Sequence, residues 1–362
     1  MDSVTQFALG ACVGVAVLGR KIGPARAALT GGALGTLPDL DVFLAHDDPI
    51  ESFVRHRGWT HSLFVHAALT PVLGEIVRRF SKALEGERAL TWLSVFLCLA
   101  THALLDACTI YGTRLFWPFW TEPVSMGSIF IIDPLYTIPL LVATIWAFCS
   151  RQWTPRYGRV LTIGLGLSSA YLTWALLAQQ FVTGKANDLL ASHDVSPDQV
   201  IATPTPFNTL LWRVIGIDGD TSFNLYVPVF GRPEKSTLYT YQRNLHIKPC
   251  SPDDDRIARV AEFSHGYYRI MVQGGAVSVV DLRMGLSPNY AFRFKLGHLA
   301  AGTLVPAPTQ RAEGRGNIGE DIDWLLANLS GTVAMRPAEA AARTDLTRYA
   351  ALAAAPDSSR AC

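Results

Sequence analysis

Six apolar stretches in the first half of the chain restrict what it can fold into. A helix needs roughly 20 residues to cross about 30 Å of hydrocarbon, and several of these stretches are shorter. Because polar groups line one end of the bundle, we expect short helices to be tolerated and predict an α-helical integral membrane protein with about six transmembrane helices. The stretches cover about Val4–Leu18, Ala27–Leu44, Ser62–Val77, Ala89–Ile110, Ile129–Cys149 and Val160–Val182.

The composition agrees with a membrane protein. Only 17% of the 362 residues are charged, and the mean hydropathy is +0.22, both displaced from the values of soluble domains. The net charge of +1 gives no reason to expect a nucleic-acid partner, whose binding normally needs a basic patch. The six cysteines lack ordered spacing, so they indicate neither a zinc ribbon nor a disulfide framework.

Glycines at GxxxG spacing mark the first two apolar stretches. Gly10 and Gly14 lie in the first, and Gly31 and Gly35 in the second. This spacing lets two helix backbones approach closely, so we predict that the two helices pack as a tight hairpin.

Basic residues alternate between loops and so predict the orientation. They concentrate in the loops after the first, third and fifth stretches, which the positive-inside rule places in the cytoplasm. The other loops, and everything after Val182, are then predicted to lie on the outer, periplasmic side. The basic residues are Arg20, Lys21 and Arg26, then Arg78, Arg79, Lys82 and Arg88, then Arg151, Arg156 and Arg159.

The chain changes character after Val182. We divide it into a membrane domain (1–183) with a metal site at its outer face, a linker (184–200), a small β-rich (α+β) extramembrane domain (201–300) and a low-complexity, partly disordered tail (301–362). A hairpin is indicated where Gln273-Gly274-Gly275 separates two alternating runs, because Gly-Gly supplies the positive φ of a tight turn.

Carboxylates and imidazoles gather in the outer layer that this topology predicts. His102 and Asp106 are four residues apart, so both project from one face of a helix. Ionisable groups inside a membrane segment are costly and usually functional. We predict that Asp39, His56, His61, His102 and Asp106 are ligands of a divalent metal, zinc being favoured by the His/Asp mixture and manganese being possible.

Each of these residues also has a plainer interpretation. His102 and Asp106 could join two helices through a hydrogen bond, and Pro38–Asp41 could be an ordinary turn. Arg57 could hold an anionic oxygen bidentately or could snorkel to the membrane interface. Thr60 is predicted to cap the helix that follows it.

Taken together, these motifs resemble those of the membrane-bound metal-dependent hydrolases (YdjM-like). The resemblance covers nearly the whole chain up to about Leu296, and the combination of motifs is specific although each motif alone is weak. The motifs are Met1-Asp2-x-x-Thr5, Pro38-Asp39-x-Asp41, His56-Arg57-Gly58-x-Thr60-His61-Ser62, His102-x-x-x-Asp106, Tyr111-Gly112-Thr113, Trp117-Pro118-Phe119, Ile132-Asp133-Pro134, Pro204-Thr205-Pro206-Phe207-Asn208 and Asp281-Leu282-Arg283-Met284-Gly285.

The resemblance implies a metal-dependent hydrolase of the bacterial inner membrane, distantly similar to zinc-dependent phospholipase C. We therefore expect hydrolysis of a phosphoester in a membrane lipid or lipid-like substrate, with the metal lowering the pKa of bound water to about 7. Asp41 is expected to act as general base or bridging carboxylate, and Arg57 as an oxyanion or phosphate clamp. Gln6 stands where the family commonly has histidine, so either this position lies outside the ligand set or the protein holds one metal fewer.

A non-catalytic function is the rival interpretation. A transporter or an envelope scaffold could use the same His/Asp cluster as a binding or structural site. The candidate ligands, however, are predicted to gather at one membrane face rather than at the midplane, which favours a surface-open site. No protein partner is indicated by the sequence.

Overall fold

The computed structural model of the chain describes residues 1–44, 47–231, 237–312, 316–332 and 334–344. They form two compact units. The helical unit contains Met1–Asp47, Arg55–Leu176 and Pro206–Asn208, without residues 45–46. The β unit contains Asp48–Val54, Leu177–Thr205 and the described residues from Thr209 onward.

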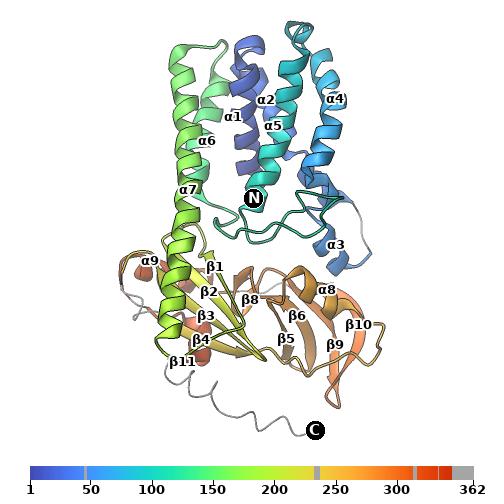
Figure 1. Cartoon of the computed structure of the whole chain (residues 1–362), viewed down its shortest axis with the longest axis vertical. Helices are drawn as coiled ribbons and strands as arrows, with labels where there is room; N and C mark the ends of the chain where they lie inside the picture. The colour runs from blue at the N-terminus through green and yellow to red at the C-terminus, as the bar shows by residue number, and fades with distance from the viewer. Residues whose placement is uncertain (45–46, 232–236, 313–315, 333, 345–362) are drawn as a thin grey trace. The chain divides into compact units, whose positions relative to one another are not determined.

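Six helices carry the six apolar stretches (Figure 1). Among the described residues, three of them, α1, α5 and α7, are long and apolar enough to cross a membrane, and α6 is a shorter apolar helix. The predicted helical membrane part is therefore confirmed, whereas the count of six spans is not. The helices are α1 (Ser3–Ile22), α2 (Pro24–Thr36), α4 (Leu63–Arg79), α5 (Arg88–Ala107), α6 (Pro134–Cys149) and α7 (Pro155–Ala191).

The predicted tight hairpin of α1 and α2 is confirmed by the spacing of its glycines. A Cβ atom placed on Gly31 would lie 2.2 Å from the carbonyl oxygen of Gly10, and one on Gly35 would lie 2.9 Å from the Cα of Gly10. No side chain fits at such distances, so the two backbones are in direct contact. This contact fixes the end of α2, from which the chain enters the site.

Short elements connect these helices at the site. The 3₁₀ helix η1 (Pro38–Phe43) follows α2, and η2 (Trp59–His61) precedes α4. The short helix α3 (Pro49–Arg55) lies between them in the chain. Within the β unit, the ring centroid of its Phe53 is 4.5 Å from that of Phe292 and 5.3 Å from that of Phe294. A further turn, η3 (Lys82–Leu84), joins α4 to α5.

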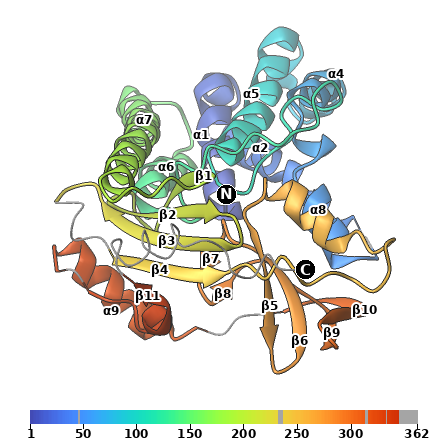
Figure 2. The same ribbon diagram turned by 60° about the horizontal axis from the view of Figure 1, so that its bottom comes forward.

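The β unit contains two main antiparallel sheets (Figure 2). One has the order β1-β2-β3-β4-β11, the other β10-β9-β6-β5, and β7 pairs with β8. The predicted hairpin is confirmed: β5 and β6 are joined by Gly274 and Gly275, with φ of 56° and 77°. The strands and helices are β1 (Gln199–Pro204), β2 (Leu211–Asp218), β3 (Thr221–Pro228), β4 (Thr237–Gln242), α8 (Arg256–Phe263), β5 (Tyr268–Gln273), β6 (Ala276–Asp281), β7 (Gly285–Leu286), β8 (Asn289–Tyr290), β9 (Arg293–Ala300), β10 (Thr303–Arg311), α9 (Ile318–Leu329), η5 (Pro337–Ala342) and β11 (Arg343–Thr344).

The ends of these elements differ from the predicted domain limits. Helix α7 continues to Ala191, into the stretch expected to be a linker, because Leu189 and Leu190 are buried. Strand β10 and helix α9 lie in the stretch expected to be a low-complexity tail. The end of that predicted tail, residues 345–362, lies outside the described residues.

Candidate metal centre

Four predicted ligands converge in the helical unit. Asp39, His61, His102 and Asp106 each offer one ligand atom, and these atoms all lie within 4.8 Å of one another. The side chains of His61, His102 and Asp106 are buried, and that of Asp39 is partly exposed. This cluster could bind a metal ion.

Three separate elements bring these side chains together. Asp39 lies in the first turn of η1, immediately after Pro38, and His61 ends η2. His102 and Asp106 lie one turn apart on α5. Ser62, and not Thr60 as predicted, caps α4, because the Ser62 hydroxyl accepts hydrogen bonds from the backbone N–H groups of Phe64 and Val65.

The tautomer of His102 follows from its hydrogen bond to the backbone. Its Nδ1 lies 2.6 Å from the carbonyl oxygen of Gly35. A carbonyl oxygen can only accept, so Nδ1 carries the proton and donates. In the neutral ring Nε2 then presents a lone pair, as a metal ligand requires.

The same reasoning applies to His61. The Thr60 hydroxyl donates its proton to Oδ2 of Asp41 at 2.9 Å. It can therefore only accept from Nδ1 of His61, which lies 2.9 Å away. His61 thus also carries its proton on Nδ1 and presents Nε2 to the cluster.

Electron-rich atoms face one another at the centre of the cluster. The two Nε2 atoms of His61 and His102 are 3.1 Å apart. Asp39 Oδ1 lies 3.3 and 3.5 Å from them, and Asp106 Oδ2 lies at the same two distances. Asp106 Oδ2 is buried and accepts no hydrogen bond within the described part of the chain. Four lone-pair donors around one point are the arrangement that a cation stabilises, so the residues fit a metal.

His56 lies outside this set of four, although it was predicted to be a ligand. Its Nδ1 donates to Oδ1 of Asp41 at 2.8 Å, and its side chain is 25% exposed. The His56 ring centroid is 6.0 Å from that of His61. The structure therefore makes His56 an imidazole paired with a carboxylate at the edge of the cluster.

Asp41 is occupied by hydrogen bonds. Besides those from His56 and Thr60, it accepts one from the backbone N–H of Arg57 at 3.0 Å. Burial acts to raise the pKa of Asp41, but the hydrogen bonds that it accepts from His56 and from the backbone N–H of Arg57 act to lower it, and the pKa lies below its ordinary value. Asp41 thus orients His56 directly and His61 through Thr60.

Arg57 is buried against Asp106. Its Nε lies 3.1 Å from Oδ2 of Asp106, and its Nη1 donates to the Thr109 hydroxyl at 2.9 Å. Its guanidinium carbon is 5.0 Å from the ring centroid of Tyr111. Arg57 adopts φ of 59°, which a non-glycine residue rarely does. This backbone turn directs the guanidinium toward the cluster.

Three supporting residues had weak or no signals in the sequence. Gln6 is buried and donates from Nε2 to Oδ1 of Asp106 at 2.9 Å, which supports the interpretation that this position lies outside the ligand set. The amino group of Met1 also forms an ion pair with Asp106. Gly35 acts through its carbonyl oxygen, which no side-chain pattern could have indicated.

Apolar helices long enough to span a membrane, together with a buried His/Asp cluster, define an integral membrane protein with a candidate metal centre. The family model "YdjM inner membrane protein" matches residues 1–182. The chain belongs to this family and is an inner-membrane protein, as the resemblance predicted.

Two relatives extend the comparison. The chain is 28% identical over 306 residues to "Uncharacterized protein YfhP" of Bacillus subtilis (strain 168), covering 81% of this chain and 89% of that protein. It is 30% identical over 183 residues to "Inner membrane protein YbcI" of Escherichia coli (strain K12), covering 50% of this chain and 94% of that protein. No solved structure matches the chain significantly.

Proposed function

We propose that the chain is a metal-dependent hydrolase of the bacterial inner membrane that cleaves a phosphoester in a lipid-like substrate. The observation that carries this proposal is the convergence of four lone-pair donors within 4.8 Å. The buried Oδ2 of Asp106, 3.3 Å from Nε2 of His61, also accepts no hydrogen bond within the described part of the chain, as expected of an atom that coordinates a metal.

In this proposal Asp39, His61, His102 and Asp106 hold a divalent cation. Zinc suits the mixture of imidazole and carboxylate, and manganese is the second candidate. Such a cation supplies a Lewis acid that acidifies water and offsets the negative charge developing on the phosphoryl oxygens. Arg57 keeps Asp106 in place through the 3.1 Å contact, and its predicted role as phosphate clamp stays a prediction.

His56 is the side chain best placed to move a proton. Asp41 holds its Nδ1, so Nε2 remains for exchange with water or with the leaving group. The His56 side chain is partly exposed, so its ring has access to solvent. We therefore assign the general acid–base role to His56, with Asp41 as its positioning carboxylate, in place of Asp41 as the base.

The function is tested with purified full-length protein, by elemental analysis and by a screen of phosphoesters and phospholipids before and after chelation. We expect a stoichiometric divalent metal and a hydrolysis that chelation abolishes and reloading restores. Asp106→Ala should lose both metal and hydrolysis. His56→Ala should keep its metal and lose hydrolysis by about 10²–10⁴-fold, the range for general acid–base groups.

The outcomes separate the possible functions. Stoichiometric metal without hydrolysis of any phosphoester would move the assignment toward a binding or scaffold protein. Metal content that survives in Asp106→Ala would contradict the ligand set. His298 lies on the exposed face of β9, so His298→Ala is a matched histidine control that should change neither quantity.

We also propose six membrane spans with the cluster and the β unit on the periplasmic side. The support is the alternation of basic loops, which the positive-inside rule assigns to the cytoplasm. In a cysteine-free background, a membrane-impermeant thiol reagent added from outside should label Gln273→Cys, at an exposed turn of the β unit, and not Ala83→Cys, between α4 and α5. Labelling of Ala83→Cys alone would reverse the orientation.

A further inference from the structure

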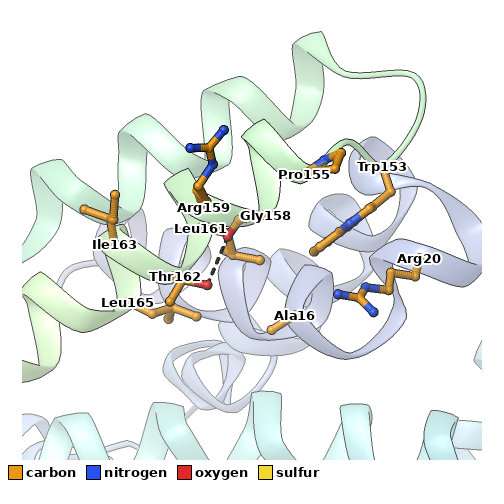
Figure 3. A pocket seen from close by; sticks show the side chains of 10 residues that line it. All are labelled: Ala16, Arg20, Trp153, Pro155, Gly158, Arg159, Leu161, Thr162, Ile163 and Leu165. Carbon is orange, nitrogen blue, oxygen red and sulfur yellow. Dashed lines mark hydrogen bonds between the residues drawn. The ribbon is translucent and has the colours of Figure 1, made fainter.

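A second site is indicated at the opposite end of α1, away from the metal centre. A cavity of about 660 Å³ opens between α1 and the start of α7 (Figure 3). Gln6 and Ala16 are separated by about 15 Å along the helix axis, at 1.5 Å per residue. The lining residues are Ala16, Arg20, Trp153, Pro155, Gly158, Arg159, Leu161, Thr162, Ile163 and Leu165.

Two glycines make room for the aromatic wall of this cavity. A Cβ atom on Gly19 would lie 3.2 Å from the Trp153 ring, and one on Gly158 would lie 3.0 Å from it. The half-buried indole therefore packs closely against α1 and α7, and its ring centroid is 5.7 Å from that of Tyr157. Its ring gives the cavity an apolar wall, as an acyl chain requires.

The charges at this cavity are all positive. Arg20 stacks on Trp153, with its guanidinium carbon 5.1 Å from the ring centroid. Arg159 also lines the cavity, and neither arginine has an ion pair with a carboxylate among the described residues. None of the ten lining residues is acidic. An anion would therefore meet two unneutralised guanidinium groups beside an apolar wall.

The loops next to the cavity strengthen this positive field. A Cβ atom on Gly23 would lie 3.2 Å from the carbonyl oxygen of Arg151, so the loop after α1 touches the loop before α7. Arg151 lies in the second of these loops, and Arg26 and Arg156 lie in the first turns of α2 and α7, whereas Lys21 is neutralised by Glu87. Basic clusters at the end of membrane helices attract anionic lipid headgroups.

We propose that this cavity binds one anionic phospholipid, with its phosphate at Arg20 and Arg159 and an acyl chain along Trp153 and Leu165. A second copy of the chain or another membrane helix would cover the apolar wall but would leave the two arginines without a counter-charge. An anionic lipid matches both the two arginines, through its phosphate, and the apolar wall, through its acyl chain. This lipid is a bound component and not the substrate, because the metal centre lies at the other end of α1.

The test uses full-length protein in detergent and native mass spectrometry. Phosphatidylglycerol and phosphatidylcholine with identical acyl chains are titrated separately. We expect one phosphatidylglycerol to bind more tightly than phosphatidylcholine. Near a membrane surface each Lys or Arg contributes about fivefold in affinity for anionic lipid. The double variant R20Q/R159Q should therefore bind phosphatidylglycerol roughly 25-fold more weakly than the wild-type protein.

The controls separate a built site from diffuse attraction. R26Q/R151Q removes one arginine from the start of α2 and one from the loop before α7, both outside the cavity lining, and should keep most of the preference. R20K/R159K should retain binding, because charge is preserved. Thr162→Trp fills the cavity and leaves both arginines intact, and it should weaken the binding of both lipids.

Three results would overturn the proposal. One is equal binding of phosphatidylglycerol and phosphatidylcholine to the wild-type protein. Another is an equal loss in R26Q/R151Q and R20Q/R159Q, which would mean that only diffuse charge acts. The third is a lipid-free dimer that Thr162→Trp abolishes, which would show a second copy as the occupant. If Thr162→Trp elutes as misfolded protein, the two arginine pairs still decide the question.

Discussion

Two buried polar clusters, one in each unit, have opposite hydrogen-bonding patterns. In the β unit, Glu339 accepts hydrogen bonds from Asn224 at 2.8 Å and Tyr226 at 2.7 Å, and from Tyr241 as well. Arg336 pairs with both carboxylate oxygens of Asp321 at 2.9 Å. In the helical unit, by contrast, the imidazole and carboxylate acceptors of the metal cluster point at one another.

The difference separates a structural network from a binding site. Around Glu339 and Arg336 donors meet acceptors, so the network is satisfied by the chain itself and fastens η5 to the sheet. Around His61 and His102 the two Nε2 atoms face each other, and the buried Oδ2 of Asp106 accepts no hydrogen bond within the described part of the chain. A buried acceptor without a partner is costly. A metal ion bound by these atoms would remove that cost, as would a proton on one of the two imidazoles. Burial and charge alone would not have distinguished the two clusters.

The largest effects are expected when each cluster is disrupted in turn. His102→Ala should lower the metal affinity by more than 10- to 100-fold, which is roughly the loss expected when a residue that only hydrogen-bonds a metal ligand is removed. Glu339→Ala should keep its metal and lower the free energy of unfolding by about 3–5 kcal/mol, because three buried donors lose their acceptor and Arg336 loses one of its two carboxylate partners. Elemental analysis and denaturant unfolding of both variants measure the two quantities.

The comparison fails if the two variants behave alike. A His102→Ala protein that is destabilised but keeps stoichiometric metal would make the helical cluster a staple between helices. A Glu339→Ala protein that loses metal would show that the β-unit network supports the site. Glu339→Gln, which keeps the shape of the side chain and one of its two acceptor oxygens, is the matched control and should be destabilised less than Glu339→Ala.

A smaller effect is expected from a change at Thr60, whose hydroxyl links Asp41 to the metal-ligand candidate His61. Thr60→Val keeps the shape and removes the hydroxyl that accepts from His61 and donates to Asp41. The proton of His61 is then no longer fixed on Nδ1, so we expect metal affinity to fall by about 10- to 100-fold without loss of stoichiometry at saturation. Competition with a chelator of known affinity measures this, and Thr60→Ser should restore the wild-type value.

The helices and the ligand types could be predicted from sequence because both follow local rules. Six apolar stretches indicated six helices, and the i, i+4 spacing placed His102 and Asp106 on one face of α5. The GxxxG pairs predicted the contact of α1 and α2, since only small residues allow that approach.

The roles within the site depend on contacts between distant segments, so the sequence could not supply them. His56 and His61 are both histidines of one motif, yet only His61 faces α5, because Arg57 takes a left-handed conformation between them. The distinction between ligand and positioning carboxylate likewise rests on Asp39 reaching the two Nε2 atoms while Asp41 binds Thr60 and His56. The ordered structure of β10 and α9 depends on pairing with β9 and burial of Trp324, which no local pattern showed.

The smallest effect is expected at Gln6, the position where the family commonly has histidine. Its amide donates to Oδ1 of Asp106, whereas the cluster uses Oδ2 of that carboxylate. Gln6→His should therefore leave the metal stoichiometry unchanged and alter affinity by less than the roughly tenfold cost of losing an outer partner, because an imidazole N–H can donate in the same place. Gln6→Leu removes the donor without adding a ligand and should weaken metal binding more than Gln6→His. An additional equivalent of zinc in Gln6→His, found by elemental analysis after dialysis, would mean instead that position 6 is a vacant ligand position and that this chain holds one metal fewer than its relatives.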